Sequence, residues 1–366
     1  SNYDYNAFMK WNMVSGKAQI IDFFPQAEKE RGRLHRRVFH IGEKLYFIPF
    51  RGRYIHIWDL KLERWELVEI SSEEIQVADG FFTADGFWIF PSYVRWAVIV
   101  FHTESCQVES LPYLTEKIGE YIGGYKNWML LDIACVCQKG QLFYLAEYRR
   151  SKIFCIDGSS KKLVFVFSNT ERGMDGGKIK LQGISVCGEK DFYLTSLEEK
   201  AIYVWNPQEG IKERFACDTE VYGKRTPFIR GIDINEKYGL ALPCHSNWIF
   251  RLNKLTGSVE KIRYPDGFGR CKIYSLFCGY EKNGEEILLY PRCGNGLLTI
   301  NGCTGGTRYT PLQLNQADNM YFSGFYRNVI RQRLYTGKLN ESFGWMDVLE
   351  DYLDEVAGME EKVKNK

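Results

Sequence analysis

The sequence predicts an all-β protein built from one four-stranded unit that is repeated along the chain. Three observations support this prediction. Aromatic residues make up 15% of the 366 residues, which is typical of strands rather than of helical bundles. Short apolar runs alternate with Gly, Asp and charged turns, as in antiparallel sheets. One strand type recurs at intervals of 47, 43, 55, 49, 47 and 48 residues, measured between the closing residues of neighbouring copies.

This recurring strand, which we name strand C, closes on Asp or Asn in six of its seven copies. Such side chains accept hydrogen bonds from the backbone two residues further on and so start a turn, which explains their place at the strand end. The seven copies are Phe8–Asn12, Ile55–Asp59, Val98–His102, Ile153–Asp157, Ile202–Asn206, Ile249–Asn253 and Leu297–Asn301.

A second apolar strand, strand B, precedes six of these copies, and four of its six copies end in proline. Proline suits the end of a ladder, where its missing N–H costs nothing. A tight turn and a further apolar strand lie ahead of strand B, so each repeat contains strands A, B, C and D in that order. The copies of strand B are Leu45–Pro49, Phe87–Pro91, Leu142–Ala146, Asp191–Thr195, Gly239–Pro243 and Ile287–Pro291.

A four-stranded repeat of roughly 40 to 50 residues fits one blade of a β-propeller. The endings Ile57-Trp58-Asp59 and Val204-Trp205-Asn206 resemble the close of a WD40 repeat. The whole pattern is similar to propellers of the kelch and galactose-oxidase type and to uncharacterised bacterial propeller proteins. The resemblance covers residues 1–314 and implies the fold. It implies no ligand residues, because the sequence lacks the Gly-His dipeptide of WD40 repeats and the Gly-Gly pair of kelch repeats.

Seven copies of strand C predict a seven-bladed propeller, with six blades and an extra edge hairpin as the alternative. The first repeat lacks strands A and B, so either residues 320–335 supply them or they precede Ser1. We expect the propeller to occupy residues 1–338, with a partial first blade. Residues 339–366 form a tail whose apolar residues at i, i+3 and i+4 predict a C-terminal amphipathic helix, packed on the propeller or docked on a partner. They are Trp345, Val348, Leu349, Tyr352, Leu353 and Val356.

Composition excludes several classes of protein. The net charge of +2 argues against a nucleic-acid-binding protein, and no apolar run approaches the length of a membrane span. No signal peptide is visible at the N-terminus. The eleven cysteines include no Cys-x-x-Cys pair and fall within strands, which predicts buried reduced thiols and a cytoplasmic protein. Export is left open because the chain begins without methionine.

No catalytic residue, cofactor or metal site is predicted. The five histidines show no metal-binding spacing, and there is no Gly-x-Ser-x-Gly motif. The glycine-rich stretch Asn301–Gly306 lies at a turn and lacks the Lys-Ser/Thr of a phosphate-binding loop. Asp79 and Asp132 serve acid–base chemistry only if the fold brings them together.

The loops between strands B and C are rich in Arg, Tyr, Trp and His, whereas the A–B turns carry mainly Gly, Glu and Lys. In a propeller the B–C loops meet on one face, and loops on a rigid scaffold are where binding residues concentrate. Arg, Tyr and Trp are also the residues that dominate protein interfaces. The candidate ligand-binding residues are Arg51, Arg53, Tyr93, Arg95, Trp96, Glu147, Tyr148, Arg149, His245, Asn247, Trp248, Arg292 and Asn295.

The residues at the entrances to the A strands are expected to ring the mouth of the central channel with both charge signs. Such a ring either binds an anionic or zwitterionic small ligand or pairs with itself and closes the channel. The candidates are Arg36, Asp79, Asp132, Gln182, Arg230 and Lys272.

We therefore predict a non-catalytic binding propeller that recognises a protein or peptide through its B–C loops. The alternative is a carbohydrate-binding or carbohydrate-active propeller, lyase- or hydrolase-like, with its site at the channel mouth, because aromatic rings also stack on sugars. A third hypothesis is a structural module that self-associates through the tail helix.

Overall fold

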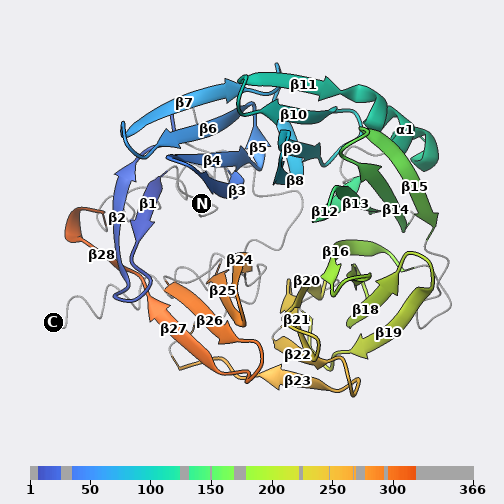
Figure 1. Cartoon of the computed structure of the whole chain (residues 1–366). Helices are drawn as coiled ribbons and strands as arrows, with labels where there is room; N and C mark the ends of the chain where they lie inside the picture. Colours follow the sequence, from blue (N-terminus) through green and yellow to red (C-terminus); the bar gives the residue numbers. More distant parts are fainter. Residues whose placement is uncertain are drawn as a thin grey trace, which may run out of the picture. The chain divides into compact units, whose positions relative to one another are not determined.

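The computed structural model describes residues 7–25, 35–123, 132–148, 151–168, 179–221, 226–246, 248–266, 268, 277–291 and 296–318. The chain divides into two compact units, residues 1–313 and 314–366. The first unit is a seven-bladed β-propeller, so the predicted fold class and blade number are confirmed (Figure 1). The predicted tail helix lies outside the described residues, and so does the predicted domain boundary at residue 338.

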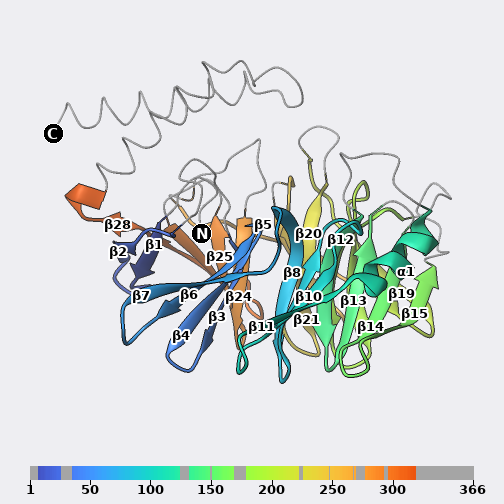
Figure 2. The same ribbon diagram turned by 90° about the horizontal axis from the view of Figure 1, so that it is seen from above.

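Blades 2 and 3 follow the predicted order of strands A, B, C and D from the axis outward (Figures 1 and 2). A short extra strand, β5 (Arg51–Gly52), extends blade 3 because it pairs with the start of β8. Blade 2 contains β3 (His35–Ile41), β4 (Lys44–Pro49), β6 (Tyr54–Asp59) and β7 (Arg64–Glu69), and blade 3 contains β8 (Ile75–Thr83), β9 (Gly86–Pro91), β10 (Val98–His102) and β11 (Gln107–Leu111).

Blades 4 to 7 repeat the same four-stranded antiparallel sheet. Blade 4 contains β12 (Ile133–Lys139), β13 (Leu142–Glu147), β14 (Lys152–Asp157) and β15 (Lys162–Ser168), and blade 5 contains β16 (Leu181–Cys187), β17 (Asp191–Ser196), β18 (Ala201–Asn206) and β19 (Gly210–Ala216). Blade 6 contains β20 (Phe228–Asp233), β21 (Tyr238–Pro243), β22 (Ile249–Asn253) and β23 (Val259–Ile262), and blade 7 contains β24 (Phe277–Asn283), β25 (Glu286–Pro291), β26 (Gly296–Asn301) and β27 (Thr307–Pro311).

Blade 1 joins the two ends of the propeller. Its sheet has the order β1 (Phe8–Trp11), β2 (Lys17–Asp22) and β28 (Gln313–Leu314), so the late strand adds to the outer edge of the early hairpin. The backbone N–H of Gln313 donates to the carbonyl of Gly16 at 2.7 Å. The predicted strands C and D of this blade are thus present, whereas residues 320–335, the predicted source of its inner strands, lie outside the described residues.

The Asp and Asn residues that close the C strands make the turns expected of them. Oδ1 of Asp59 accepts the backbone N–H groups of Lys61 and Leu62 at 2.9 and 2.8 Å. Asn12, Asp157, Asn206, Asn253 and Asn301 form equivalent turns. In the exceptional copy, Nδ1 of His102 instead lies 2.9 Å from the carbonyl oxygen of Asp85.

Helix α1 (Pro112–Ile122) connects blade 3 to blade 4 and was not predicted from the sequence. Its buried residues include Leu114, Ile118 and Ile122 at i, i+4 and i+8, a spacing that marks an amphipathic helix. Proline starts the helix, and Gly123 ends it in the left-handed conformation with its N–H on the carbonyl of Gly119. The signal was therefore present in the sequence, within a connection that the repeat assigned to a loop.

The core lies between neighbouring blades. Trp88 and Phe90 of β9, for example, meet Phe143 of β13 with ring centroids 5.0 and 4.9 Å apart. Burying each large apolar side chain stabilises the fold by roughly 1.5–3 kcal/mol. Of the eight cysteines whose side chains the structure describes, six are buried and none forms a disulfide. Burial raises the pKa of the Cys155 thiol to about 11, which suits an unreactive core residue.

Blades 1 and 2 meet in a cluster of aromatic rings that encloses two histidines. Nε2 of His35 lies 3.1 Å from Nδ1 of His56, and Nε2 of His56 lies 3.0 Å from the carbonyl oxygen of Pro25. Phe24 packs on both imidazoles, with centroids 4.2 and 5.5 Å away. Burial lowers the pKa of both histidines, so both are neutral at neutral pH.

Candidate functional site

Tight hairpins and variable connections lie at opposite ends of the blades (Figure 2). The A–B and C–D turns form one end, which we call the hairpin face. The B–C loops and the D-to-A connections form the other, which we call the loop face. The described residues of the B–C loops there are 50–53, 92–97, 148, 151, 197–200, 244–246 and 248.

The two arginines of the first B–C loop are held in surface ion pairs. Arg51 pairs with Glu74, and Arg53 pairs with Glu69. The Arg51 side chain stays 61% exposed and that of Arg53 42% exposed, so a partner can reach both. Exposed pairs of this kind contribute at most about 1 kcal/mol to stability.

The loop of blade 3 folds its three candidate residues onto one another. The Trp96 indole N–H donates to Glu73 Oε1 at 2.8 Å, and its ring is only 9% exposed. The Arg95 guanidinium lies over the rings of Trp96 and Tyr93, 4.4 and 5.3 Å from their centroids. Arg95 is exposed, so this loop presents one guanidinium on an aromatic support.

The remaining loop candidates divide between structural positions and residues outside the described part of the chain. Glu147 is fully buried at the end of β13, and Tyr148 is half-buried. Nδ1 of His245 lies 3.1 Å from the carbonyl oxygen of Thr226, a contact that ties two loops of blade 6 together. Arg149, Asn247, Arg292 and Asn295 lie outside the described residues.

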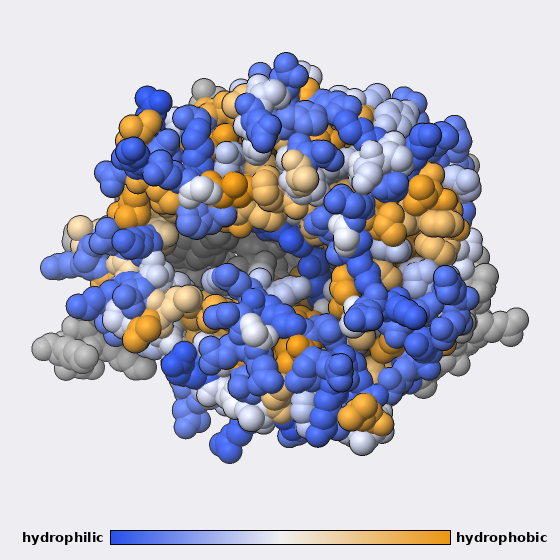
Figure 3. Space-filling view, viewed as in Figure 1, coloured by the Kyte–Doolittle hydropathy of each residue, from blue (hydrophilic) through white to orange (hydrophobic). Residues whose placement is uncertain are grey.

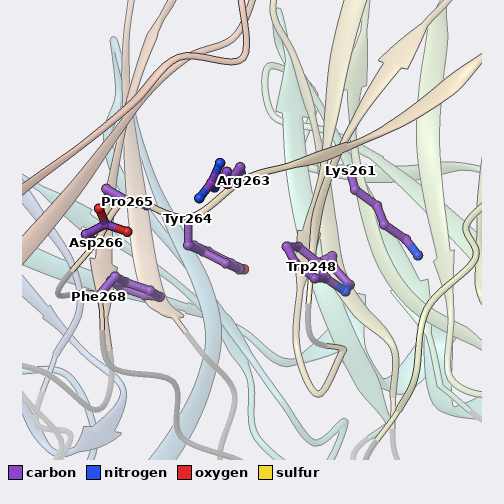
Figure 4. A pocket seen from close by; sticks show the side chains of 7 residues that line it. All are labelled: Trp248, Lys261, Arg263, Tyr264, Pro265, Asp266 and Phe268. Carbon is purple, nitrogen blue, oxygen red and sulfur yellow. The ribbon is translucent and has the colours of Figure 1, made fainter.

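Trp248 is the candidate that lines a cleft. Its ring stacks on Tyr264 with a centroid separation of 6.0 Å and an interplanar angle of 21°, and Tyr264 stacks on Phe268 at 4.9 Å and 14°. Figure 4 shows these three rings in a row. The cleft has a volume of about 570 Å³ and is completed by Lys261, Arg263, Pro265 and Asp266. We call this group of seven residues the aromatic cleft.

The rim of the aromatic cleft carries both charge signs. Lys261, Arg263 and Asp266 are exposed, and Nζ of Lys261 lies 3.1 Å from Oδ2 of Asp218. The carbonyl of Arg263 accepts the hydroxyl of Thr307 at 3.0 Å, which fixes this connection to blade 7. The cleft therefore combines an apolar floor with a few polar groups at its edge, the usual composition of a ligand site.

The inner strands form a second constellation at the axis of the ring. All six described inner strands contain a one-residue bulge at the same level of the sheet, so equivalent residues follow each bulge. These residues are Arg37, Asp79, Cys135, Gly183, Arg230 and Gly279. Figure 3 shows a hollow at the centre of the ring.

Arg230 joins opposite sides of this ring. Its Nη2 lies 3.6 Å from Oδ2 of Asp79, three blades away, and donates to Sγ of Cys135 at 2.9 Å. The thiol of Cys135 in turn donates to the carbonyl of Ile184 at 3.5 Å. Arg230 also lies 5.9 Å from the ring centroid of Tyr280 on β24.

Asp79 is the buried acid of this cluster, only 1% exposed. Nε and Nη2 of Arg37 lie 2.6 and 2.9 Å from its two carboxylate oxygens, a bidentate contact. Burial by itself favours the neutral acid, but Arg37, Arg36 and Arg230 outweigh it and hold the pKa of Asp79 below its usual range. We call Arg36, Arg37, Asp79, Cys135, Arg230 and Tyr280 the channel cluster.

The other channel candidates occupy different positions. Arg36 and Gln182 are the extra residues of their bulges, one position before the ring. Asp132 is buried, and its carboxylate accepts the backbone N–H of Val94 at 3.1 Å, so it fixes the loop of blade 3. Lys272 lies outside the described residues.

Several residues of these two sites were not singled out from the sequence. Tyr264 and Phe268 belong to a D-to-A connection without strand periodicity, although two aromatic residues in so short a connection are a usable signal. Arg37 was missed because a bulge shifts the register by one residue, and nothing in the pattern marks the bulge. Cys135 was assigned only to the core.

No protein-family model matches the chain, and no curated protein matches it. Solved structures of similar fold do exist. A streptogramin B lyase shares 10% identity and a TM-score of 0.54, covering 86% of this chain and 90% of its own. Virginiamycin B lyase from Staphylococcus aureus, with quinupristin, shares 11% identity and a TM-score of 0.51, covering 75% of this chain and 83% of its own. The extracellular domain of BT4673 from B. thetaiotaomicron shares 11% identity and a TM-score of 0.52, over 78% of this chain and 34% of that one.

These similarities show the fold alone. The similar structures named above are bacterial propeller proteins, and the kelch or WD40 type stays a prediction. Within the described ranges, no helix is long and apolar enough to cross a membrane, and no group of three His, Cys, Asp or Glu side chains is placed to hold a metal ion. Because an extracellular domain is among these structures, the cytoplasmic location also stays a prediction.

Proposed function

We propose that the propeller is a non-catalytic binding module that takes an extended protein segment across its loop face, with one aromatic or long aliphatic side chain of the partner held in the aromatic cleft. The observation that carries this proposal is the cleft, a volume of about 570 Å³ floored by stacked rings. Ligand pockets typically measure about 300–1,000 Å³ and are lined by aromatic groups with a few polar ones.

The rings suit recognition because they are already ordered. Trp248 and Phe268 are both held against Tyr264 by stacking, so binding costs little side-chain entropy. Arg95, an exposed arginine on this face, belongs to blade 3, whereas Trp248 belongs to blade 6. A partner that contacts both must cross the channel mouth, which favours a protein segment over a small ligand.

Panning a displayed random peptide library on the full chain tests the proposal. We expect selected peptides to share an aromatic or long aliphatic residue, and we expect Trp248→Ala to weaken their binding at least tenfold, as loss of an interface hot spot does. Fluorescence polarisation of one labelled peptide measures the dissociation constant. Leu255→Ala is the matched control, because Leu255 is 71% exposed on the same blade but on the hairpin face.

Equal affinity of the Trp248→Ala and Leu255→Ala variants for the peptide would overturn the role of the cleft. Failure to enrich any peptide would count against the whole proposal. Circular dichroism of each variant confirms that a loss of binding is not a loss of fold.

The carbohydrate alternative uses the same rings, and a lyase is among the proteins of similar fold. Acid–base work by Asp79 is disfavoured because the arginines keep its carboxylate ionised and weakly basic at neutral pH. A glycan array probed with the full chain separates the two hypotheses. Sugar binding that Trp248→Ala abolishes, without any enriched peptide, would replace the protein partner by a carbohydrate.

A further inference from the structure

The channel cluster contains more positive than negative charge. Arg37 contacts the Asp79 carboxylate and Arg230 lies 3.6 Å from it, and these two guanidiniums together with that of Arg36 lower the pKa of Asp79. The cluster is also removed from bulk water, since the side chain of Arg230 is 13% exposed and that of Asp79 is 2% exposed. Charges in such a place interact more strongly than on the surface, so the excess of two positive charges attracts anions.

Two of the three guanidiniums retain hydrogen-bonding capacity. Arg37 makes a bidentate contact with Asp79, so it is the guanidinium with the least capacity to bind a further anion. Arg230 hydrogen-bonds the sulfur of Cys135, which is a weak acceptor, and the side chain of Tyr280, and it reaches the carboxylate only at 3.6 Å. These contacts do not use all five N–H donors of a guanidinium. Arg36 forms no hydrogen bond with any described residue and only lies 5.9 Å from the ring of Phe50.

The channel cluster lies toward the loop-face end of the inner strands. Arg36 and Arg37 lie near the start of β3 and Arg230 near the start of β20, at the ends where the D-to-A connections enter the inner strands. The Arg37 side chain is 32% exposed, so solvent reaches this level of the channel. Asp79 already occupies one side of the site as a resident carboxylate, which indicates the chemistry that the arginines accept.

We propose that the channel cluster is a binding site for a small oxyanion, a carboxylate or a phosphate, held by Arg36 and Arg230 while Arg37 remains paired with Asp79. Arginine favours both anions because its planar fork matches two oxygens at once. The site is separate from the aromatic cleft, so this inference does not depend on the proposed function. Of the two alternatives predicted for the residues around the channel mouth, the inference favours binding of a small ligand over a ring of charges that pairs with itself and closes the channel.

The test uses the full chain and two probes, inorganic phosphate and citrate, each compared with sodium chloride at equal ionic strength. Binding to the folded state alone raises the unfolding midpoint, and the rise grows with the logarithm of the ligand concentration once that concentration exceeds the dissociation constant. We expect this rise for wild type with at least one probe, and at least a fivefold weaker apparent affinity for Arg36→Gln. Arg36→Gln is the main variant because Arg36 makes no hydrogen bond with described residues, and circular dichroism of the variant checks that it folds. Arg64→Gln, which changes an exposed arginine of the outer strand β7, is the matched control and keeps the wild-type response.

The outcomes separate the sources of the anion. A response to phosphate alone assigns the site to a phosphate, and a response to citrate alone assigns it to a carboxylate. No rise of the midpoint with either probe beyond that in sodium chloride, or an equal response of Arg36→Gln and wild type, overturns the inference. Peptide capture by Arg36→Gln and anion binding by Trp248→Ala, measured in parallel, show which of the two proposals has failed.

Discussion

At the hairpin face, six C–D turns are held by the same contact, an Asp or Asn oxygen that accepts backbone N–H groups within the turn. Four A–B turns share a glycine with φ between 58° and 60°. At the loop face the described connections differ from blade to blade: an ion-paired arginine loop in blade 2, a helix after blade 3 and an aromatic cleft between blades 6 and 7.

The two faces differ in how far the repeat determines their structure. The C–D turns of the hairpin face share one local pattern of hydrogen bonds, which recurs in six repeats. The connections of the loop face carry residues that occur in one blade only, and these residues form the sites. The two faces therefore differ in what a substitution should do: a modest, uniform loss of stability at one, and a specific loss of binding or of a long-range contact at the other.

The largest expected effect tests the channel cluster. Asp79→Ala removes the only carboxylate among the groups we assign to this cluster and leaves the half-buried Arg37 and the largely buried Arg230 without it. We expect the free energy of unfolding to fall by about 3–5 kcal/mol, as for one partner of a buried ion pair. Urea denaturation measures it. Asp157→Ala, a C–D turn residue, is the control and should cost about 1 kcal/mol.

A loss for Asp79→Ala no larger than for Asp157→Ala would erase the contrast between the two faces. It would mean that the contact between Arg230 and Asp79 does not hold the opposite sides of the ring together. The difference between the variants is therefore the informative quantity.

The same contrast explains what the sequence could predict. Asp59 and its five Asp or Asn equivalents obey a rule that acts within four residues, so strand C and its turn were predicted correctly in these six copies. Arg230 and Asp79 are 151 positions apart, and only closure of the ring brings them together. Their pairing also depends on bulges, which re-aim one side chain and leave no mark on the apolar pattern. The fold can thus be predicted from short sequence patterns that recur from blade to blade. The sites cannot, because they depend on contacts between residues that are far apart in the sequence.

A smaller loss of stability is expected when the pH is lowered, because two buried histidines lie at the junction of blades 1 and 2. His35 and His56 have lowered pKa values in the folded protein, so the unfolded chain takes up protons first as the pH falls. Stability is fully present above the unfolded pKa of about 6.5. It declines below that pH, by at most about 1.4 kcal/mol per pH unit for each histidine, until the folded pKa is reached.

Urea midpoints between pH 7.5 and 5 measure this decline. His56→Gln retains hydrogen-bonding groups but does not titrate, so we expect a shallower decline. His40→Gln changes an exposed histidine and should keep the wild-type slope. Identical slopes for all three proteins would show that the buried pair does not link blade packing to pH.

The smallest effect probes a single turn of the hairpin face. Asn253 Oδ1 accepts the N–H groups of Leu255 and Thr256 at 3.0 and 3.3 Å, and Asn253→Ala removes both contacts. Because solvent replaces them at this exposed turn, we expect a loss of about 1 kcal/mol in urea denaturation, with peptide and anion binding unchanged. Leu255→Ala, in the same turn, should change stability by less than about 0.5 kcal/mol. If Asn253→Ala weakened peptide binding while the fold persisted, the hairpin face would share in recognition, and the division of labour between the two faces would have to be redrawn.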